Sequence, residues 1–294
     1  MTNMDKVLNT REIKSLISLI DDNEVYDVVK EQIIKLGSSA LAFIDEELES
    51  CLDLEKTSRL KSVYDKIRLD ISCSELKNWR DYNSENLFKA LAIISKFQYP
   101  NLDLTYINKE INRIKDSLWL ELNDNLTALE KVRVLNNIFF NIYKFSGDSK
   151  DFFNPINSFL IDVLERKKGN PISICSLYSI VAQSVGIPIY GINLPKHYIV
   201  AYVDRLYANP FHDIKRNNIL FYINPFSGGE IYSLSEVFGF LHKLNVAVED
   251  SNILPCQNEV TVSRMLKNLI SIYNERGDEI NGDKYNALLN IFEE

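Results

Sequence analysis

Apolar residues recur every three or four positions through the first 118 residues, which is the spacing of amphipathic helices. The first of these runs ends before the polar break at 21–23, and the second ends at Gly37. Further runs with the same period cover 40–49, 54–71, 84–97 and 102–118. The pattern therefore predicts a wholly helical region over residues 1–118.

The opening helices are short and separated by tight breaks, which favours a HEAT-like arrangement for this region. At the other end of the chain, helical runs over 260–273 and 285–292 are separated by Gly277, which predicts a C-terminal helical hairpin. The expected domain organisation is a helical region at 1–118, a core at 119–255 and a hairpin at 256–294.

The middle of the chain changes from a helical to an extended period. A helical run covers residues 126–145, and a buried helix that is apolar on most sides is expected from Pro171 to Val185. Beyond it, three segments rich in β-branched and aromatic side chains predict strands of an antiparallel sheet, at 187–194, 197–203 and 219–223. Turn residues at 209–210 and 216–218 predict an exposed connection between the last two strands. The predicted fold class is α+β, with a small sheet packed on a buried helix.

Polar and special residues frame the start of the buried helix. Gly169 follows a helical run that ends at Lys168, and it is expected to adopt the left-handed conformation of a helix C-cap. Asn170 is expected to cap the next helix and Pro171 to be its first residue, where the missing N–H has no cost. The basic run from Arg166 to Lys168 fits the last turn of a helix, where cations meet the negative end of the dipole.

The composition and charge of the chain argue against several classes of function. The formal net charge of −8 and the pI near 5.1 argue against phosphate-backbone binding, so no nucleic-acid partner is expected. Polar residues interrupt the apolar stretch at 172–192, which argues against a membrane span. No secretory signal follows Met1, so a cytoplasmic location is expected. The cysteines are widely spaced and are expected to be reduced thiols.

Two side chains of the predicted sheet are candidates for chemistry. His197 begins one strand and Asn224 ends the next, after a buried helix, which is the layout of papain-like and transglutaminase-type sites. In such sites a thiolate at the helix N-terminus is activated by the helix dipole and the imidazole, and a third side chain orients the imidazole. A histidine that merely bonds a neighbouring backbone group is an equal alternative for His197.

A longer set of motifs occurs in a fixed order along the chain. The motifs are Asn157-Ser158-Phe159-Leu160, Gly169-Asn170-Pro171-Ile172-Ser173, Gly186-Ile187-Pro188, Pro195-Lys196-His197, and Asn224-Pro225-Phe226 before Gly228-Gly229. With them the chain resembles the bacterial SirB-type transglutaminase-like family over most of its length. The resemblance implies a transglutaminase-like core between helical flanks, and it puts Pro171 at the nucleophile position of active transglutaminases. An aspartate is frequent in the family where this chain has Asn224.

Cys175 is the alternative nucleophile. It lies one helical turn after Pro171, about 6 Å further from the helix N-terminus, so a buried and inert thiol is favoured. The candidates for binding in a residual cleft are Arg166, Tyr198, Phe226, Tyr190 and Tyr232. Aromatic residues in strands belong more often to the core.

Three hypotheses about function remain open. The leading one is a non-catalytic transglutaminase-like protein that binds an unknown peptide or protein partner, because the nucleophile position holds Pro171. The second is a cysteine-dependent hydrolase or acyltransferase that uses Cys175, His197 and Asn224. The third is a structural helical-repeat adaptor. No cofactor is expected, and no metal either, because His197, His212 and His242 would have to meet from separate elements.

Overall fold

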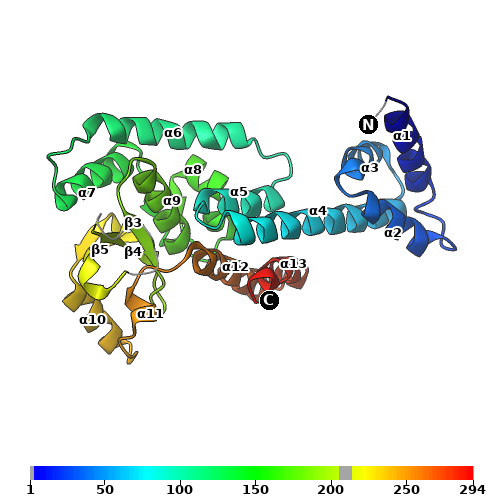
Figure 1. Cartoon of the computed structure of the whole chain (residues 1–294). Coiled ribbons are helices and arrows are strands. Elements are labelled where there is room, and N and C mark those ends of the chain that lie inside the picture. The colour runs from blue at the N-terminus through cyan, green and yellow to red at the C-terminus, as the bar shows by residue number, and fades with distance from the viewer. Residues whose placement is uncertain (1–2, 205–213, 294) are drawn as a thin grey trace. The chain divides into compact units, whose positions relative to one another are not determined.

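The computed structural model describes residues 3–204 and 214–293, with side chains described from Thr10 onwards (Figure 1). The chain forms two compact units, Met1–Lys77 and Asn78–Glu294, and their boundary falls inside the long helix α4 (Leu54–Tyr82). The second unit contains helices on both sides of residue 118. The sequence-based domain ranges 1–118, 119–255 and 256–294 stay predictions.

The N-terminal unit is a small helical assembly with its own core. It contains α1 (Asn3–Ser18), α2 (Tyr26–Leu36), α3 (Ser38–Ser50) and most of α4. The helix stop at Gly37 is confirmed, since this residue adopts φ 57° between α2 and α3, a conformation that glycine takes without steric cost. The buried side chains of this core are Ile13, Ile17, Ile20, Val29, Ile33, Ala40, Ile44, Leu60, Val63 and Ile67.

Helix α4 is longer than the sequence pattern predicted. The expected run ends at residue 71, but the helix continues to Tyr82. Leu76 and Trp79 are fully buried, so the apolar face that stabilises the helix extends beyond the predicted end. The indole Nε1 of Trp79 donates a hydrogen bond of 2.8 Å to the carbonyl of Asn86, which fixes the turn into the next helix.

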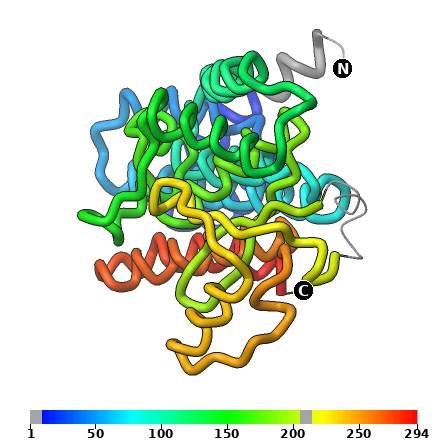
Figure 2. Tube along the Cα trace, turned by 90° about the vertical axis from the view of Figure 1, so that its left-hand side faces the viewer, coloured from blue at the N-terminus to red at the C-terminus, as the bar shows by residue number. Residues whose placement is uncertain are grey.

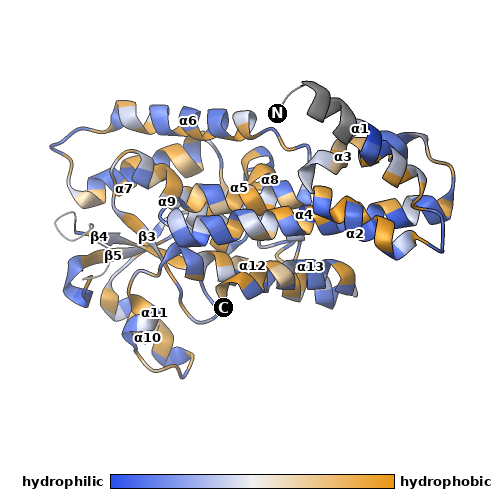
Figure 3. Ribbon diagram, turned by 45° about the vertical axis from the view of Figure 1, so that its right-hand side comes forward, coloured by the Kyte–Doolittle hydropathy of each residue, from blue (hydrophilic) through white to orange (hydrophobic). Residues whose placement is uncertain are grey.

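The second unit consists mainly of helices that surround α9 (Pro171–Ser184). Among its neighbours, α5 (Leu87–Gln98), α6 (Leu104–Glu121) and α8 (Leu160–Arg166) all contact α9. Hydrophobic colour is dense along α5 and alternates with hydrophilic colour along α6 in Figure 3. The remaining helical elements are α7 (Ala128–Asn136), η1 (Asn137–Ile142), η2 (Pro155–Ser158), η4 (Arg216–Asn218), η5 (Pro225–Ser227), α10 (Leu234–Lys243), α11 (Asp250–Ile253), α12 (Asn258–Glu275), α13 (Glu279–Leu289) and η6 (Asn290–Phe292).

The main sheet is antiparallel, with the order β3-β4-β5-β6. It is formed by β3 (Ile189–Ile192), β4 (Ile199–Val203), β5 (Ile219–Asn224) and β6 (Glu230–Tyr232). The three predicted strands and their antiparallel pairing are confirmed. The sequence pattern missed β6, because three residues after Gly228-Gly229 are too few to show an alternation. The predicted turn at 209–210 lies outside the described residues.

Helix α9 begins as predicted. The Asn170 Oδ1 accepts a hydrogen bond of 2.9 Å from the Ser173 N–H, and Pro171 occupies the first helical position. The Asn170 Nδ2 donates to the Ser158 Oγ at 2.8 Å, which ties the cap to η2. Most of α9 is buried, and it contacts β3 and β4, so one face of the sheet rests on this helix.

The predicted left-handed cap at Gly169 is wrong. Lys167 takes the left-handed conformation, with φ 58°, and ends α8. Gly169 instead belongs to β2 (Lys168–Gly169), which pairs in parallel with β1 (Ser146–Gly147). A Cβ on Gly169 would lie 2.4 Å from the Ser173 Oγ, so glycine is required here for close packing and not for a positive φ.

The other face of the sheet is covered by α10 and α11. Their side chains share a core cluster with Ile199 and Ala201 of β4 and with Tyr222 of β5. The predicted C-terminal hairpin is confirmed by α12 and α13, which turn at Gly277, and Figure 2 shows it in orange and red. Helix α12 also contacts α5 and α9. None of the helices in the described ranges is both long and apolar enough to cross a membrane.

Candidate functional site

A cavity of about 430 Å³ lies between the sheet and α10, and it contains two of the predicted site residues. His197 and Asn224 both line it, whereas Cys175, Pro171, Arg166, Tyr198 and Phe226 do not. The full lining is Leu194, His197, Ile199, Asn224, Tyr232, Glu236, Val237, Gly239, Phe240 and Lys243.

The strand register brings His197 and Asn224 to the same face of the sheet. Val200 pairs with Ile223, so Ile199 lies opposite Asn224 on the neighbouring strand. His197 lies in the loop, two positions before β4, and lines the same cavity as Ile199 and Asn224. The ring of His197 makes an edge contact with Phe240 of α10, with ring centroids 4.7 Å apart. His197 is therefore on the α10 side of the sheet.

The loop before β4 holds His197 in place through its backbone. Lys196 adopts φ 62°, a left-handed conformation that is uncommon for a residue with a Cβ. The His197 N–H donates to the Leu194 carbonyl at 3.2 Å. The same carbonyl accepts a hydrogen bond of 2.6 Å from the Arg264 Nη1, which also donates to the Asn193 Oδ1. Arg264 of α12 thus fastens the segment that carries the histidine.

The electrostatic surroundings favour the neutral form of His197. Partial burial is the larger cause that lowers the pKa of His197 below its usual value of 6.5, and the positive charge of Arg264 lowers it further. A neutral imidazole at pH 7 can accept a hydrogen bond at one nitrogen and donate at the other. The side chain is suited to bind a polar group of a ligand.

The side chain of Asn224 forms its hydrogen bonds within the turn that follows β5. Its Oδ1 accepts from the Ser227 N–H at 3.4 Å, and its Nδ2 donates to the Ser227 Oγ at 3.0 Å. The Asn224 side chain therefore caps η5, and its recorded bonds do not reach the imidazole of His197 in the described part of the chain. The structure brings the two residues to one cavity without joining them as a catalytic pair.

Cys175 contacts the backbone beside His197 and not its ring. The side chain is fully buried on α9, and its Sγ–H donates to the Tyr198 carbonyl at 3.3 Å. Burial raises the pKa of the Cys175 thiol far above its usual range, which keeps it protonated at neutral pH. Because α9 and α10 cover opposite faces of the sheet, the thiol and the imidazole approach the sheet from different sides.

The residues proposed for cleft binding lie elsewhere. Tyr198 is almost fully buried, and its hydroxyl is 2.6 Å from the Thr261 Oγ1 on α12. Phe226 makes an edge contact with Phe152 and approaches the backbone of Gly147. Both aromatic side chains pack against protein rather than line the cavity that contains His197.

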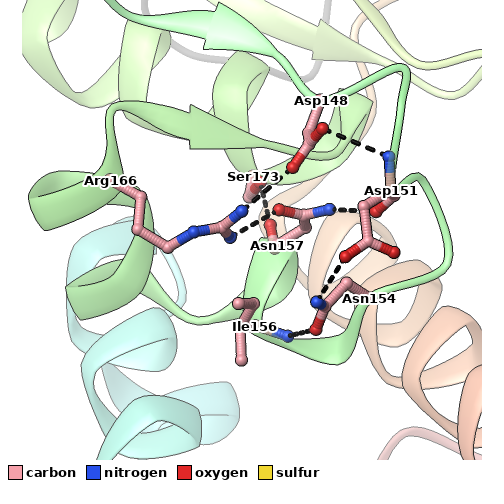
Figure 4. A network of polar contacts seen from close by, with 7 residues as sticks. All are labelled: Asp148, Asp151, Asn154, Ile156, Asn157, Arg166 and Ser173. Atoms are coloured by element: carbon pink, nitrogen blue, oxygen red, sulfur yellow. Dashed lines mark hydrogen bonds and ion pairs between the residues drawn. The ribbon is translucent and has the colours of Figure 1, made fainter.

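Arg166 belongs to a polar network below the start of α9, shown in Figure 4. Its guanidinium donates to the Asn157 Oδ1 at 2.8 Å and lies 3.0 Å from the Asp148 Oδ2. The Ser173 Oγ donates to the Asn157 carbonyl at 2.5 Å, and the Asn157 Nδ2 donates to the Asp151 carbonyl at 2.7 Å. Arg166 thus joins Asp148 to η2, and the Ser173 hydroxyl joins η2 to the first turn of α9.

The cavity also contains residues that the sequence analysis did not select. Glu236, Phe240 and Lys243 come from α10, and only their helical period was visible in the sequence. Tyr232 was named as a possible cleft residue and does line the cavity. The amphipathic pattern of α10 predicts a helix but not which side chains meet His197, since that depends on how α10 crosses the sheet.

The described residues include no group of three or more His, Cys, Asp and Glu side chains placed to hold a metal ion. His212 lies outside the described residues. His242 is on α10 but does not line the cavity with His197.

The Arg166 network gives a first prediction. Burial alone would raise the pKa of Asp148, but the hydrogen bond from Asp151 and the charge of Arg166 outweigh it, so the pKa of Asp148 is lowered. The ionised carboxylate stabilises the fold above its unfolded pKa of about 3.9 and loses this contribution as the pH falls through the lower folded value. Arg166→Met should lower the free energy of unfolding by about 2–3 kcal/mol at pH 7, measured by urea denaturation.

The matched control is Arg113→Met, which removes an exposed arginine that pairs with Glu110 on α6. It should leave the urea midpoint unchanged. The stability difference between Arg166→Met and the wild type should shrink as the pH falls below about 4, because Asp148 becomes protonated. An equal loss of stability from both substitutions would contradict the role of the network.

The burial of Cys175 gives a second prediction. Iodoacetamide should label Cys175 slowly in the native protein and rapidly in urea, because the thiol is buried and its pKa is raised. Cys51, which is partly exposed, provides an internal control that should react quickly in both conditions. Peptide mass spectrometry distinguishes the two sites. Fast labelling of Cys175 in the native protein near neutral pH would contradict this account and support Cys175 as a nucleophile.

The surroundings of His197 give a third prediction. Its imidazole should titrate below pH 6.5, because burial and the charge of Arg264 both disfavour the cation. Arg264→Gln should raise this pKa, whereas Arg113→Gln should leave it unchanged. The measurement is the NMR shift of the ring Hε1 signal against pH, assigned with His197→Asn. A His197 pKa at or above 6.5 in the wild type would refute this account.

Comparison with known proteins agrees with the fold. A family model described as "Transglutaminase-like superfamily" matches residues 105–267, which is more than half of the chain. A UPF0162 protein of Xylella fastidiosa (strain 9a5c) is 26% identical over 193 residues, covering 64% of each chain. A UPF0162 protein of Vibrio cholerae is 26% identical over 136 residues, covering 45% of this chain and 50% of the relative.

A shorter similarity extends to an animal protein. F-box only protein 21 of Mus musculus is 35% identical over 66 residues, which cover 22% of this chain and 10% of that protein. No solved structure matches the chain. The match spans about 64% of the length of the first curated relatives, and their names state no activity. From the family match and the observed core, the chain belongs to the transglutaminase-like superfamily.

Proposed function

We propose that this chain is a non-catalytic transglutaminase-like protein that binds a peptide or protein segment in the cavity beside His197. The observation that carries the proposal is the composition of that cavity. It holds the imidazole of His197 and the amide of Asn224, but its lining includes no thiol. Position 171, where the family resemblance puts the nucleophile, is a proline at the start of α9.

The cavity has the properties of a site for an apolar side chain. Its volume of about 430 Å³ lies within the usual range of ligand pockets. Leu194, Ile199 and Phe240 contribute apolar surface, while Glu236 and Lys243 contribute charges of opposite sign. A peptide presents apolar side chains on a polar backbone, so one of its residues could enter the cavity while its amides contact the charged groups.

The adjacent edge of the sheet supports a peptide over a compact small molecule. Strand β6 is the last strand in the order β3-β4-β5-β6, and its Tyr232 lines the cavity. At the opposite edge, β3 is partly covered because Ile192 forms a bridge with Pro255. An extended segment can add to an uncovered strand edge through backbone hydrogen bonds. Within the described residues no strand pairs with the outer edge of β6, so this edge offers a place where a bound peptide could continue beyond the cavity.

The other two hypotheses receive less support. The raised pKa and burial of Cys175 weigh against a thiol hydrolase or acyltransferase, because the thiolate is the reactive form. A helical-repeat adaptor would act through the N-terminal unit and would not use the cavity. An intracellular location and a protein partner remain part of the proposal.

The proposal can be tested by selecting peptides from a random display library on the full-length protein. Phe240→Ala and Lys243→Glu should each weaken the selected peptides by about tenfold, because both residues line the cavity. Phe153→Ala removes an exposed phenylalanine that does not line the cavity, and it should leave the affinity unchanged. Fluorescence anisotropy gives the affinities.

Melting temperatures check that the variants fold, and the exposed Lys243 keeps the test valid if Phe240→Ala unfolds the protein. Unchanged peptide affinity in Lys243→Glu and Phe240→Ala would overturn the proposed site. Turnover of an acyl substrate that is lost in Cys175→Ala would overturn the proposal that the protein is non-catalytic.

A further inference from the structure

A second cavity, of about 480 Å³, is lined by cations from two separate helices of the second unit. Arg80 comes from the end of α4, and Arg264 and Lys267 come from α12. Asn193 of the loop after β3 and Ser263 add neutral polar groups. This gathering of cations is unexpected in a chain with a formal net charge of −8.

One face of α12 builds most of this cavity. Glu259, Ser263 and Lys267 are spaced four residues apart and therefore lie in one row along the helix. Arg264 lies in the adjacent row. Because α12 is also held by its contacts with α5, α9 and α13, these side chains are presented from a fixed element.

Arg264 is the key group because its charge is not neutralised. Its Nη1 donates to the Asn193 Oδ1 and to the Leu194 carbonyl, and no ion pair with a carboxylate is recorded for it within residues 3–204 and 214–293. Partial burial removes part of the hydration of the guanidinium and thereby lowers its pKa. The hydrogen bonds that fix Nη1 leave Nε and Nη2 without a recorded partner among the described residues.

The other two cations differ from Arg264. The Arg80 Nε lies 2.8 Å from the Asp81 Oδ1, and its Nη1 donates to the Ile291 carbonyl. The Lys267 Nζ lies 3.7 Å from the Glu293 Oε1, and both of these side chains are well exposed. Arg80 is therefore held in position, while Lys267 can turn toward a ligand at little cost.

From this arrangement we infer that the cavity of Arg80, Arg264 and Lys267 binds an oxyanion, a phosphoryl or carboxylate group of a small molecule. The N–H groups of a guanidinium lie in one plane, and two of them can bind two oxygens of a phosphoryl or carboxylate group at once. The Ser263 hydroxyl can donate a further hydrogen bond. Glu259 lines the same cavity and opposes the binding of a simple anion, so its carboxylate limits the affinity.

The inference is tested on the full-length protein by NMR titration with inorganic phosphate and, separately, with succinate in a buffer of low ionic strength. At least one of the two anions should bind saturably. Binding of phosphate assigns a phosphoryl ligand, and binding of succinate alone assigns a carboxylate ligand. Arg264→Gln should weaken the binding by about tenfold or more, because it removes a charge-assisted hydrogen bond.

Two further variants test whether the anion binds in this cavity. Glu259→Gln should strengthen the binding, because it removes the only carboxylate among the residues described as lining the cavity. Arg113→Gln, on the outer surface of α6, should leave it unchanged. If Arg264→Gln melts early, the exposed Lys267→Gln carries the test and should weaken binding by about threefold.

No saturable binding of either anion would overturn the inference. Wild-type affinity in both Arg264→Gln and Lys267→Gln would do the same. Both results are obtained from anion binding in the absence of peptide, and the lining residues of the two cavities differ, so the two proposals can fail independently.

Discussion

The first turn of α9 is fastened by polar groups that are buried with it, and the rest of the core is arranged around this turn. Asn170 caps the helix through the Ser173 N–H and reaches the Ser158 hydroxyl. Arg166 joins Asp148 to Asn157, whose carbonyl accepts from the Ser173 hydroxyl. A buried polar group is costly unless it forms a hydrogen bond, so the loss of one side chain would leave its partners in the network unsatisfied. The network leaves little freedom in where α9 begins.

The position of α9 determines what the family scaffold can do in this chain. At its first position stands Pro171, which suits the start of a helix and offers no nucleophile. One turn later Cys175 is buried against the backbone of Tyr198, where burial keeps the thiol protonated. The imidazole of His197 faces a different cavity, beside Phe240 of α10. The fold of the superfamily is retained, while the histidine and the thiol lie on different sides of the sheet.

The two cavities share one short segment of backbone. Asn193 lines the basic cavity and Leu194 lines the cavity of His197. Arg264 donates hydrogen bonds to both of these residues. The two cavities are therefore held in part by the same arginine side chain.

The amino-acid sequence alone specifies the helices with long apolar periods, three of the four strands in the main sheet, and the start of α9. These features depend on local patterns, on capping residues and on the fixed φ of proline. It also marked His197 and Asn224, because their motifs follow the order seen in the family. The assignment of Gly169 to a helix cap failed, since its pairing with Gly147 and its packing against Ser173 join segments that are distant in sequence.

Which side chains surround each candidate residue depends on how the separate elements pack. Arg166 and Tyr198 were expected in a cleft, but Arg166 is bonded to Asp148 and Tyr198 is buried beside Thr261. Glu236 and Lys243 meet His197 because of how α10 crosses the sheet, and Arg264 reaches Leu194 from a helix 70 residues later. Sequence periodicity specifies which face of an element is apolar, whereas a site forms where faces of separate elements meet, and that is fixed by packing.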